Sequence, residues 1–199
     1  MKNLFSKQRL LATCAAVAAC GAVYAAVQPL TLPWQEGATA TEHHARVLKG
    51  AGTFEGTMNM YMPGVDQPMS MPCSEIVSGL GDLWTTASFQ ADFGGIPFRG
   101  HSTLGYDVAK EKYVGTWIDN MNTHITLMEG VYDAEKDAIV MHYDGKNMMN
   151  EPVKMRNETV HTDDGYVIKF YEIYENEERL QMELVMTHEA EAVEAGSDK

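Results

Sequence analysis

The amino-acid sequence predicts an all-β fold, an antiparallel up-and-down barrel of about ten strands with a short N-terminal helix. Three observations predict it. Short segments that alternate apolar and polar side chains follow one another from about residue 51 to residue 188. Turn residues such as Pro63-Gly64, Gly94-Gly95 and Asp144-Gly145 close these segments. No crossover helices separate them, so consecutive strands are expected to pair as a meander.

The first 26 residues predict a signal peptide or an N-terminal membrane anchor. Three basic residues and no acid precede an uncharged run of small and apolar side chains, Leu10 to Val27. The basic residues are Lys2, Lys7 and Arg9. A leader of this kind carries the following domain out of the cytoplasm, so we expect an exported protein, either periplasmic or secreted.

Three fates of this leader stay open. Val23-Tyr24-Ala25 offers small residues at the −3 and −1 positions of a cleavage site. Val17-Ala18-Ala19-Cys20 is similar to a bacterial lipobox, which would place a lipid on Cys20. The uncharged run also reaches the lower limit of about 18 residues for an uncleaved membrane anchor. Membrane contact is therefore expected only through this segment or through a lipid on Cys20.

Residues 27–41 predict a linker, because prolines and a glycine interrupt any periodicity. A short helix is expected to follow, with Thr41 at the N-cap position and Glu42 in the first turn. His44, Val47 and Leu48 have the spacing of one helix face, and Gly50 is a stop signal. We expect this helix to close one end of the β-structure.

Ten segments with a period of two predict the strands. In the last of them, Leu180, Met182, Leu184 and Met186 alternate with mostly polar residues. The others, in order, are Thr53–Met62, Cys73–Leu80, Leu83–Asp92, Phe98–Gly105, Tyr113–Ile118, Thr123–Val131, Ala138–Tyr143, Val153–His161 and Tyr166–Tyr174. Residues 42–190 are thus predicted to form a single domain, followed by a disordered acidic tail at 191–199.

A flat sheet of this many strands would leave two open edges and an apolar face without cover. Closure into a barrel removes both problems. A barrel of about eight or more strands is wide enough either to fill its interior with side chains or to hold one small ligand.

Composition and motifs exclude several classes of function. The formal net charge is −13, so nucleic acid is a poor partner, since phosphate binding needs clustered Lys and Arg. The glycine-rich stretches precede predicted strands rather than helices, so they are not phosphate loops. No zinc-type Cys/His spacing and no G-x-S-x-G motif occur. Cys73 is the only cysteine outside the leader, which excludes an intramolecular disulfide in the domain. We assign no catalytic residue and no cofactor.

The middle of the chain carries a distinctive set of residues: Gly94-Gly95, Phe98, Gly100, Gly105-Tyr106-Asp107 and the run from Tyr113 to Met121. With them the chain resembles the bacterial domain-of-unknown-function family DUF1579, over nearly all of residues 45–188. It departs at Gly52-Thr53-Phe54, where the family usually has Trp after Gly, and at Thr187-His188, where the family has a Tyr/Arg ending. The resemblance implies a calycin-like, lipocalin-like barrel. It brings no established activity, cofactor or catalytic residue.

Two aromatic residues in this block are candidates for lining a ligand cavity. In a strand, Tyr113, Gly115 and Trp117 share one face, and Gly115 leaves room for a neighbouring ring. The alternative is that these residues only specify strand register and packing.

Ionisable residues in the predicted strands give further candidates for ligand binding. His101 and His124 lie in central predicted strands and are the best candidates for a proton-transfer or haem site. Glu172 shares an apolar face with Ile168, Phe170 and Tyr174, so it must pair with another group or shift its pKa. Arg156 is a candidate partner for that carboxylate, as a structural ion pair or as part of a catalytic site.

Methionine is unusually frequent, with 14 in the chain. Met58, Met60 and Met62 alternate before the Pro63 to Pro68 turn, and Met69 and Met71 alternate after it, so the two strands would bring thioethers together. Thioether ligands suit Cu(I). The favoured interpretation is an adaptable apolar lining rather than a metal site.

Three functions remain open from the sequence. The leading one is a non-catalytic exported barrel that binds a small apolar ligand in its interior. The first alternative is an enzyme that acts on a small organic substrate with interior His or Glu and Arg156. The second is a Met-rich copper-binding, structural or partner-binding module.

Overall fold

The computed structural model describes residues 39–147, 149, 151–175 and 177–189. The chain divides into two units, Met1–Thr39 and Ala40–Lys199, and the described residues belong almost entirely to the second. The predicted leader at 1–26, nearly all of the linker and the acidic tail lie outside the described residues. Within the residues that the structure describes, no helix has the length and apolar character needed to span a membrane.

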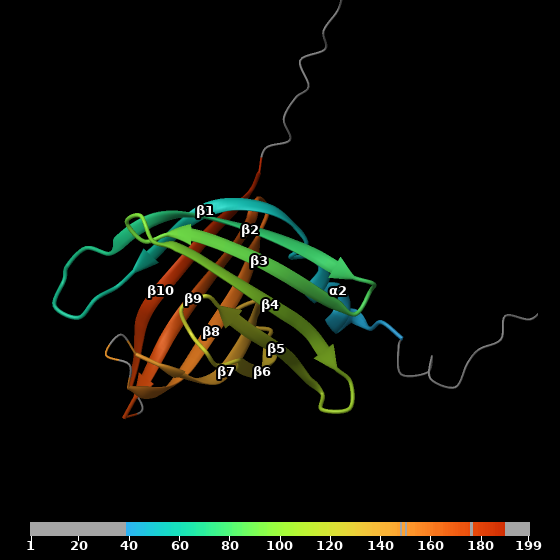
Figure 1. Ribbon diagram of the computed structural model, residues 1–199. Helices are drawn as coiled ribbons and strands as arrows, with labels where there is room; N and C mark the ends of the chain where they lie inside the picture. Colours follow the sequence, from blue (N-terminus) through green and yellow to red (C-terminus); the bar gives the residue numbers. More distant parts are fainter. Residues whose placement is uncertain (1–38, 148, 150, 176, 190–199) are drawn as a thin grey trace, which may run out of the picture. The chain divides into compact units, whose positions relative to one another are not determined.

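Ten antiparallel strands form a closed barrel, as the sequence predicts (Figure 1). Each strand pairs with its sequence neighbours, and the last strand returns to the first, with Phe54 opposite His188 and Met60 opposite Met182. The strands are β1 (Gly52–Met60), β2 (Met69–Leu80), β3 (Trp84–Asp92), β4 (Pro97–Asp107), β5 (Lys112–Asp119), β6 (Thr126–Asp133), β7 (Ala138–Lys146), β8 (Pro152–Thr162), β9 (Gly165–Tyr174) and β10 (Glu177–His188). Closure leaves no edge strand without a partner.

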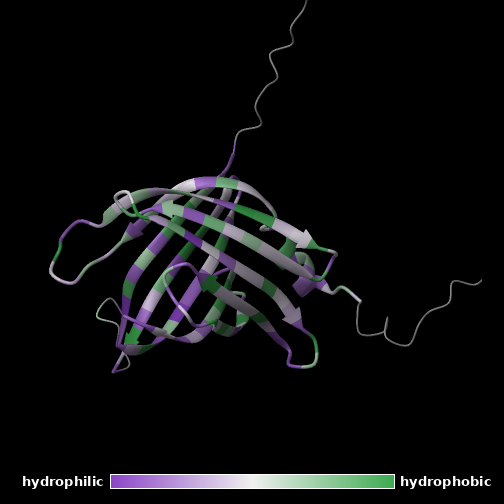
Figure 2. Ribbon diagram, viewed as in Figure 1, coloured by the Kyte–Doolittle hydropathy of each residue, from purple (hydrophilic) through white to green (hydrophobic). Residues whose placement is uncertain are grey.

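The alternation of side chains positions the interior. Along β1, Phe54 and Met58 are buried while Glu55 and Thr57 are exposed, and Figure 2 shows such alternation as green and purple bands along the strands. A period of two is required because successive side chains of a strand point to opposite faces. The apolar set of each strand therefore faces the inside of the barrel.

Short turns with local hydrogen bonds connect the strands. The Asp107 carboxylate accepts hydrogen bonds from the backbone N–H of Ala109 at 3.0 Å and of Lys110 at 3.1 Å, which fixes the β4–β5 turn. Between β5 and β6, Asp119 Oδ1 accepts from the backbone N–H of Met121 at 2.8 Å and from Asn122 at 3.0 Å. This turn delays β6 to Thr126, so the predicted start at Thr123 is wrong.

The predicted helix forms as α2 (Glu42–Leu48), with Thr41 as its N-cap residue. His44 lies 3% exposed, and its Nδ1 accepts a hydrogen bond from the Thr41 backbone N–H at 3.0 Å. Val47 packs in an apolar cluster with Tyr113, Ile139 and Met141. These contacts place the helix over the end of the barrel where β1 begins, and the expectation that it closes one end is confirmed.

Candidate functional site

The barrel encloses a cavity of about 600 Å³. Its wall is mostly apolar, because the inward positions of the strands carry methionine, phenylalanine and aliphatic side chains. Phe89, Leu104, Met128, Met155, Phe170 and Leu184 are among the lining residues. Polar groups lie mainly at the end away from α2, where exposed Asn122 and His124 of the β5–β6 loop and Asn147 after β7 also line the cavity. We call this end the mouth.

An aromatic wall lies near the mouth. The Trp117 ring lies 6.2 Å from the Phe98 ring at an interplanar angle of 26°, and the Trp117 indole N–H donates to Asp119 Oδ2 at 2.9 Å. Phe89 and Phe93 extend this wall by edge-on contacts. Gly100 makes room for the indole, since a Cβ at this position would lie 2.2 Å from Trp117. Of the two aromatic candidates of this strand, Trp117 lines the cavity.

A buried carboxyl on the cavity wall is Glu75 of β2, which sequence reasoning missed. Its side chain lines the cavity and is 9% exposed. The hydroxyl group of Tyr166, on β9, donates a hydrogen bond to Glu75 Oε2. Burial raises the pKa of the Glu75 carboxyl, and the Tyr166 hydrogen bond only partly opposes this. The signal was present, because the predicted strand Cys73–Leu80 already places Glu75 on the same face as Cys73.

The raised pKa of Glu75 predicts a pH-dependent cost to stability. In the unfolded chain this carboxyl ionises near its ordinary pKa, whereas in the folded protein its pKa is higher because the apolar wall disfavours the charged form. The free energy of unfolding therefore falls as the pH rises from the unfolded-state pKa to the folded-state pKa, by about 1.4 kcal/mol for each pH unit between them. We expect Glu75→Gln, which retains an acceptor for Tyr166, to gain stability relative to the unmodified protein as the pH rises from about 4 to about 8.

Urea unfolding at several pH values measures this difference. Glu55→Gln is the matched control, because Glu55 is exposed on the outer face of the neighbouring strand. The control is expected to show no such pH-dependent gain. Parallel stability curves for Glu75→Gln and the unmodified protein would contradict the prediction.

The predicted site residues separate in the structure. Trp117 lines the cavity, and His124 lies at the mouth in the loop before β6 rather than inside a strand. Tyr113 is 1% exposed beneath α2, where Arg46 donates to its hydroxyl at 3.3 Å and His43 Nδ1 lies 3.1 Å away. His101 is on the outer face, with its Nδ1 3.1 Å from Ser88 Oγ. The two histidines proposed for one interior site are therefore not brought together.

The proposed pairing of Glu172 with Arg156 is wrong. Glu172 is buried and accepts hydrogen bonds from Arg179 and, at 2.9 Å, from Gln181, both on β10. Asn157 lines the cavity, so its neighbour Arg156 points to the outside of β8. The interior His, Glu and Arg set on which the enzyme alternative was built does not assemble.

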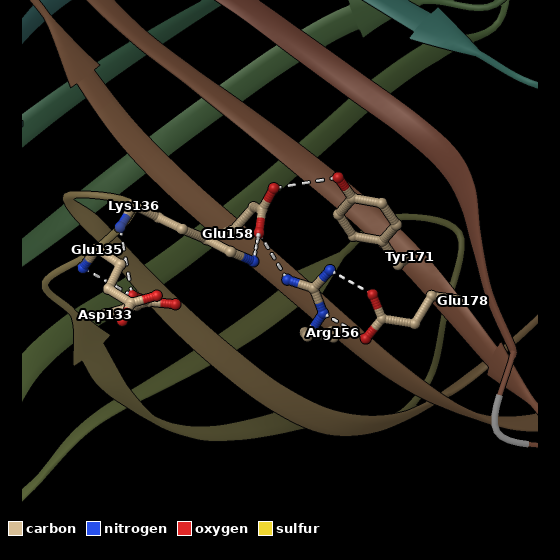
Figure 3. Close-up of polar contacts among 7 residues, drawn as sticks. All are labelled: Asp133, Glu135, Lys136, Arg156, Glu158, Tyr171 and Glu178. Carbon is tan, nitrogen blue, oxygen red and sulfur yellow. Dashed lines mark hydrogen bonds and ion pairs between the residues drawn. The ribbon is translucent and has the colours of Figure 1, made fainter.

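Arg156 instead joins an ionic cluster on the outer face (Figure 3). Its guanidinium donates to Glu158 at 2.7 Å and to both oxygens of Glu178 at 2.8 and 2.6 Å. Lys136 and the Tyr171 hydroxyl also donate hydrogen bonds to the Glu158 carboxylate, at 3.2 and 3.1 Å. Hydrogen bonds from Arg156 lower the pKa of Glu178. This cluster links β8, β9, β10 and the β6–β7 turn, which is a structural role.

The methionine strands pair as the sequence predicts, with Met58 opposite Met71 and Met60 opposite Met69. Met58 and Met71 are buried in the apolar core, while Met69 is 43% exposed and Met62 follows the end of β1. The Cys73 thiol contacts Met186 Sδ at 3.5 Å, and burial raises the Cys73 pKa to about 11. Within the described residues, no group of three or more His, Cys, Asp or Glu side chains could hold a metal ion. Cu(I) binding by the methionines stays the less favoured alternative to apolar packing.

The family described as "Protein of unknown function (DUF1579)" matches residues 39–189. This is more than half of the chain, so the chain belongs to that family. No curated protein matches the chain. Among solved structures, Rv2717c from M. tuberculosis is similar, with a TM-score of 0.57 at 11% sequence identity over 76% of this chain and 99% of that chain. At this identity the similarity shows the fold alone, and it agrees with the barrel expected from the resemblance.

Proposed function

We propose that this member of the DUF1579 family is an exported barrel that binds one small, largely apolar molecule in its interior without chemistry of its own. The observation that carries the proposal is the cavity of about 600 Å³ with its mostly apolar wall. Its volume lies within the range of about 300–1,000 Å³ typical of small-molecule sites. Export is supported by the basic and then apolar pattern of residues 1–26.

The wall has the properties that an apolar ligand requires. Aromatic side chains such as Phe89, Phe98 and Trp117 offer large, rigid contact surfaces, and methionines such as Met128 and Met155 adapt to the shape of a ligand. Apolar cavities of this kind bind apolar molecules readily because water gains few hydrogen bonds inside them. The loops at the mouth provide the route of entry.

Filling the cavity is expected to abolish binding. Thr159 of β8 lines the cavity, so Thr159→Trp would place an indole in the space that the ligand occupies. We expect at least a hundredfold loss of affinity for a simple apolar probe such as decanol, because the ligand and the new ring cannot share the volume. Isothermal titration calorimetry measures the change.

Thr57→Trp is the matched control. Thr57 lies exposed on the outer face of β1, so the same substitution adds the same ring without reducing the cavity. The control is expected to retain the affinity of the unmodified protein. Equal binding by the Thr159 and Thr57 variants would place the probe outside the barrel and contradict the proposal.

A further inference from the structure

We propose that the cavity takes a lipophilic amine, an apolar chain with one amino head group that is held against Glu75, a buried carboxyl about halfway along the wall of the barrel. This inference deepens the proposed function and rests on it. Three features of the described residues carry it: the depth of Glu75, its incomplete hydrogen bonding, and the absence of a protein cation beside it.

The position of Glu75 defines where the head group would lie. Strand β2 runs from Met69 at the mouth to Leu80 at the end covered by α2, and Glu75 lies past its midpoint. Its partner Tyr166 is the second residue of β9, which starts at the closed end. Phe89 of the aromatic wall lies directly opposite Glu75 on β3, while Phe98 and Trp117 lie nearer the mouth ends of β4 and β5. A ligand head at Glu75 would therefore leave the chain extending along this aromatic wall toward the mouth.

The hydrogen bonding of Glu75 is incomplete. A carboxylate can accept about four hydrogen bonds. Among the described residues, the Tyr166 hydroxyl to Oε2 is the one side-chain hydrogen bond of Glu75, and Oε1 receives none. The residues paired with Glu75 in the neighbouring strands are Phe54 and Phe89, which have no donors in their side chains. A ligand group with hydrogen-bond donors would supply the hydrogen bonds that Glu75 Oε1 lacks.

The charge around Glu75 favours a cationic donor. Within the described residues, Glu75 takes part in no ion pair. The other carboxylate, histidine and lysine side chains of the cavity wall, Asp119, His124 and Lys146, lie at the mouth end of their strands or loops. Burial of an unpaired carboxylate is unfavourable, and a cation within hydrogen-bond distance reverses that effect. An ammonium head supplies both the charge and the donors. The formal net charge of −13 also favours the approach of cations over anions.

Three probes of equal chain length test the head group: decylamine, decanol and decanoate, titrated calorimetrically into the purified protein near neutral pH. We expect decylamine to bind at least about tenfold more tightly than decanol, and decanoate to bind most weakly. Glu75→Gln should remove the advantage of decylamine while leaving the decanol affinity within about twofold. Glu55→Gln, which removes the same charge from the outer face of β1, should leave the advantage intact.

Each other result overturns a defined part of this proposal. Equal affinities for decylamine and decanol, or tightest binding of decanoate, would disprove the amine head and leave apolar binding in place. Failure of all three probes to bind would remove the proposed function as well. Should Glu75→Gln not fold, the order of the three probes on the unmodified protein still decides the question.

Discussion

Replacing Gly130 by alanine is expected to destabilise the barrel by more than about 3 kcal/mol, because the added methyl group meets the backbone of the neighbouring strand. Gly130 is a buried residue of β6 that pairs with Met141 of β7. A Cβ at Gly130 would lie 1.9 Å from the Val140 carbonyl oxygen and 2.8 Å from Met141 Cα. Both are backbone atoms, so the clash can be relieved only if β6 and β7 move apart and lose ladder hydrogen bonds.

Gly81→Ala is the matched control for this substitution. Gly81 has a φ of 60°, and a Cβ there meets nothing within 4 Å. The control should therefore cost only the strain of a left-handed residue, about 1–2 kcal/mol. Urea unfolding of both variants measures the difference. Similar losses for the two variants would show that β6 and β7 are not packed as closely as the barrel requires.

Replacing Arg156 by alanine is expected to cost about 3 kcal/mol. The Arg156 side chain is 8% exposed, and its removal leaves Glu158, 14% exposed, with Lys136 and Tyr171 as its remaining partners. The cost comes mainly from the poorly compensated carboxylate, with a further part from the lost contact of the guanidinium with the Tyr171 ring at 4.2 Å. Glu178 is 45% exposed and contributes less, because water can replace its partner.

Lys154→Ala is the control for the loss of Arg156. Lys154 lies on the same strand and pairs with Asp144, and both side chains are more than 70% exposed. An exposed ion pair of this kind contributes less than about 1 kcal/mol. Denaturant unfolding should separate the two variants clearly. A small loss for Arg156→Ala would mean that the cluster in Figure 3 is solvated rather than structural.

The strands and the barrel could be predicted from the sequence because two local patterns determine them. A period of two assigns each side chain to the inside or the outside of a strand, which placed Trp117, Met58 and Leu184 correctly on the inner face. Turn residues then mark where most strands end. The boundaries failed where a side chain extends a turn, as Asp119 does before β6, and where a strand continues through an expected turn, as β7 does at Asp144-Gly145.

The site was harder to predict, because it depends on the exact register between paired strands. Glu172 lies opposite Arg179 on β10, and a shift in register between Leu180 and Met182 brings Gln181 to the same carboxylate. Arg156 lies opposite Tyr171, one residue away from Glu172, and hence on the other face of the sheet. No local pattern reports such offsets. The hollow interior likewise depends on how side chains of ten strands fill a common volume.

Native mass spectrometry of the purified protein with decanol is the sharpest test of a single hollow site inside the barrel. We expect one bound molecule per folded chain for the unmodified protein and for Thr57→Trp, and none for Thr159→Trp. The absence of a bound molecule on the unmodified protein, or several molecules with equal binding to Thr159→Trp, would contradict such a site.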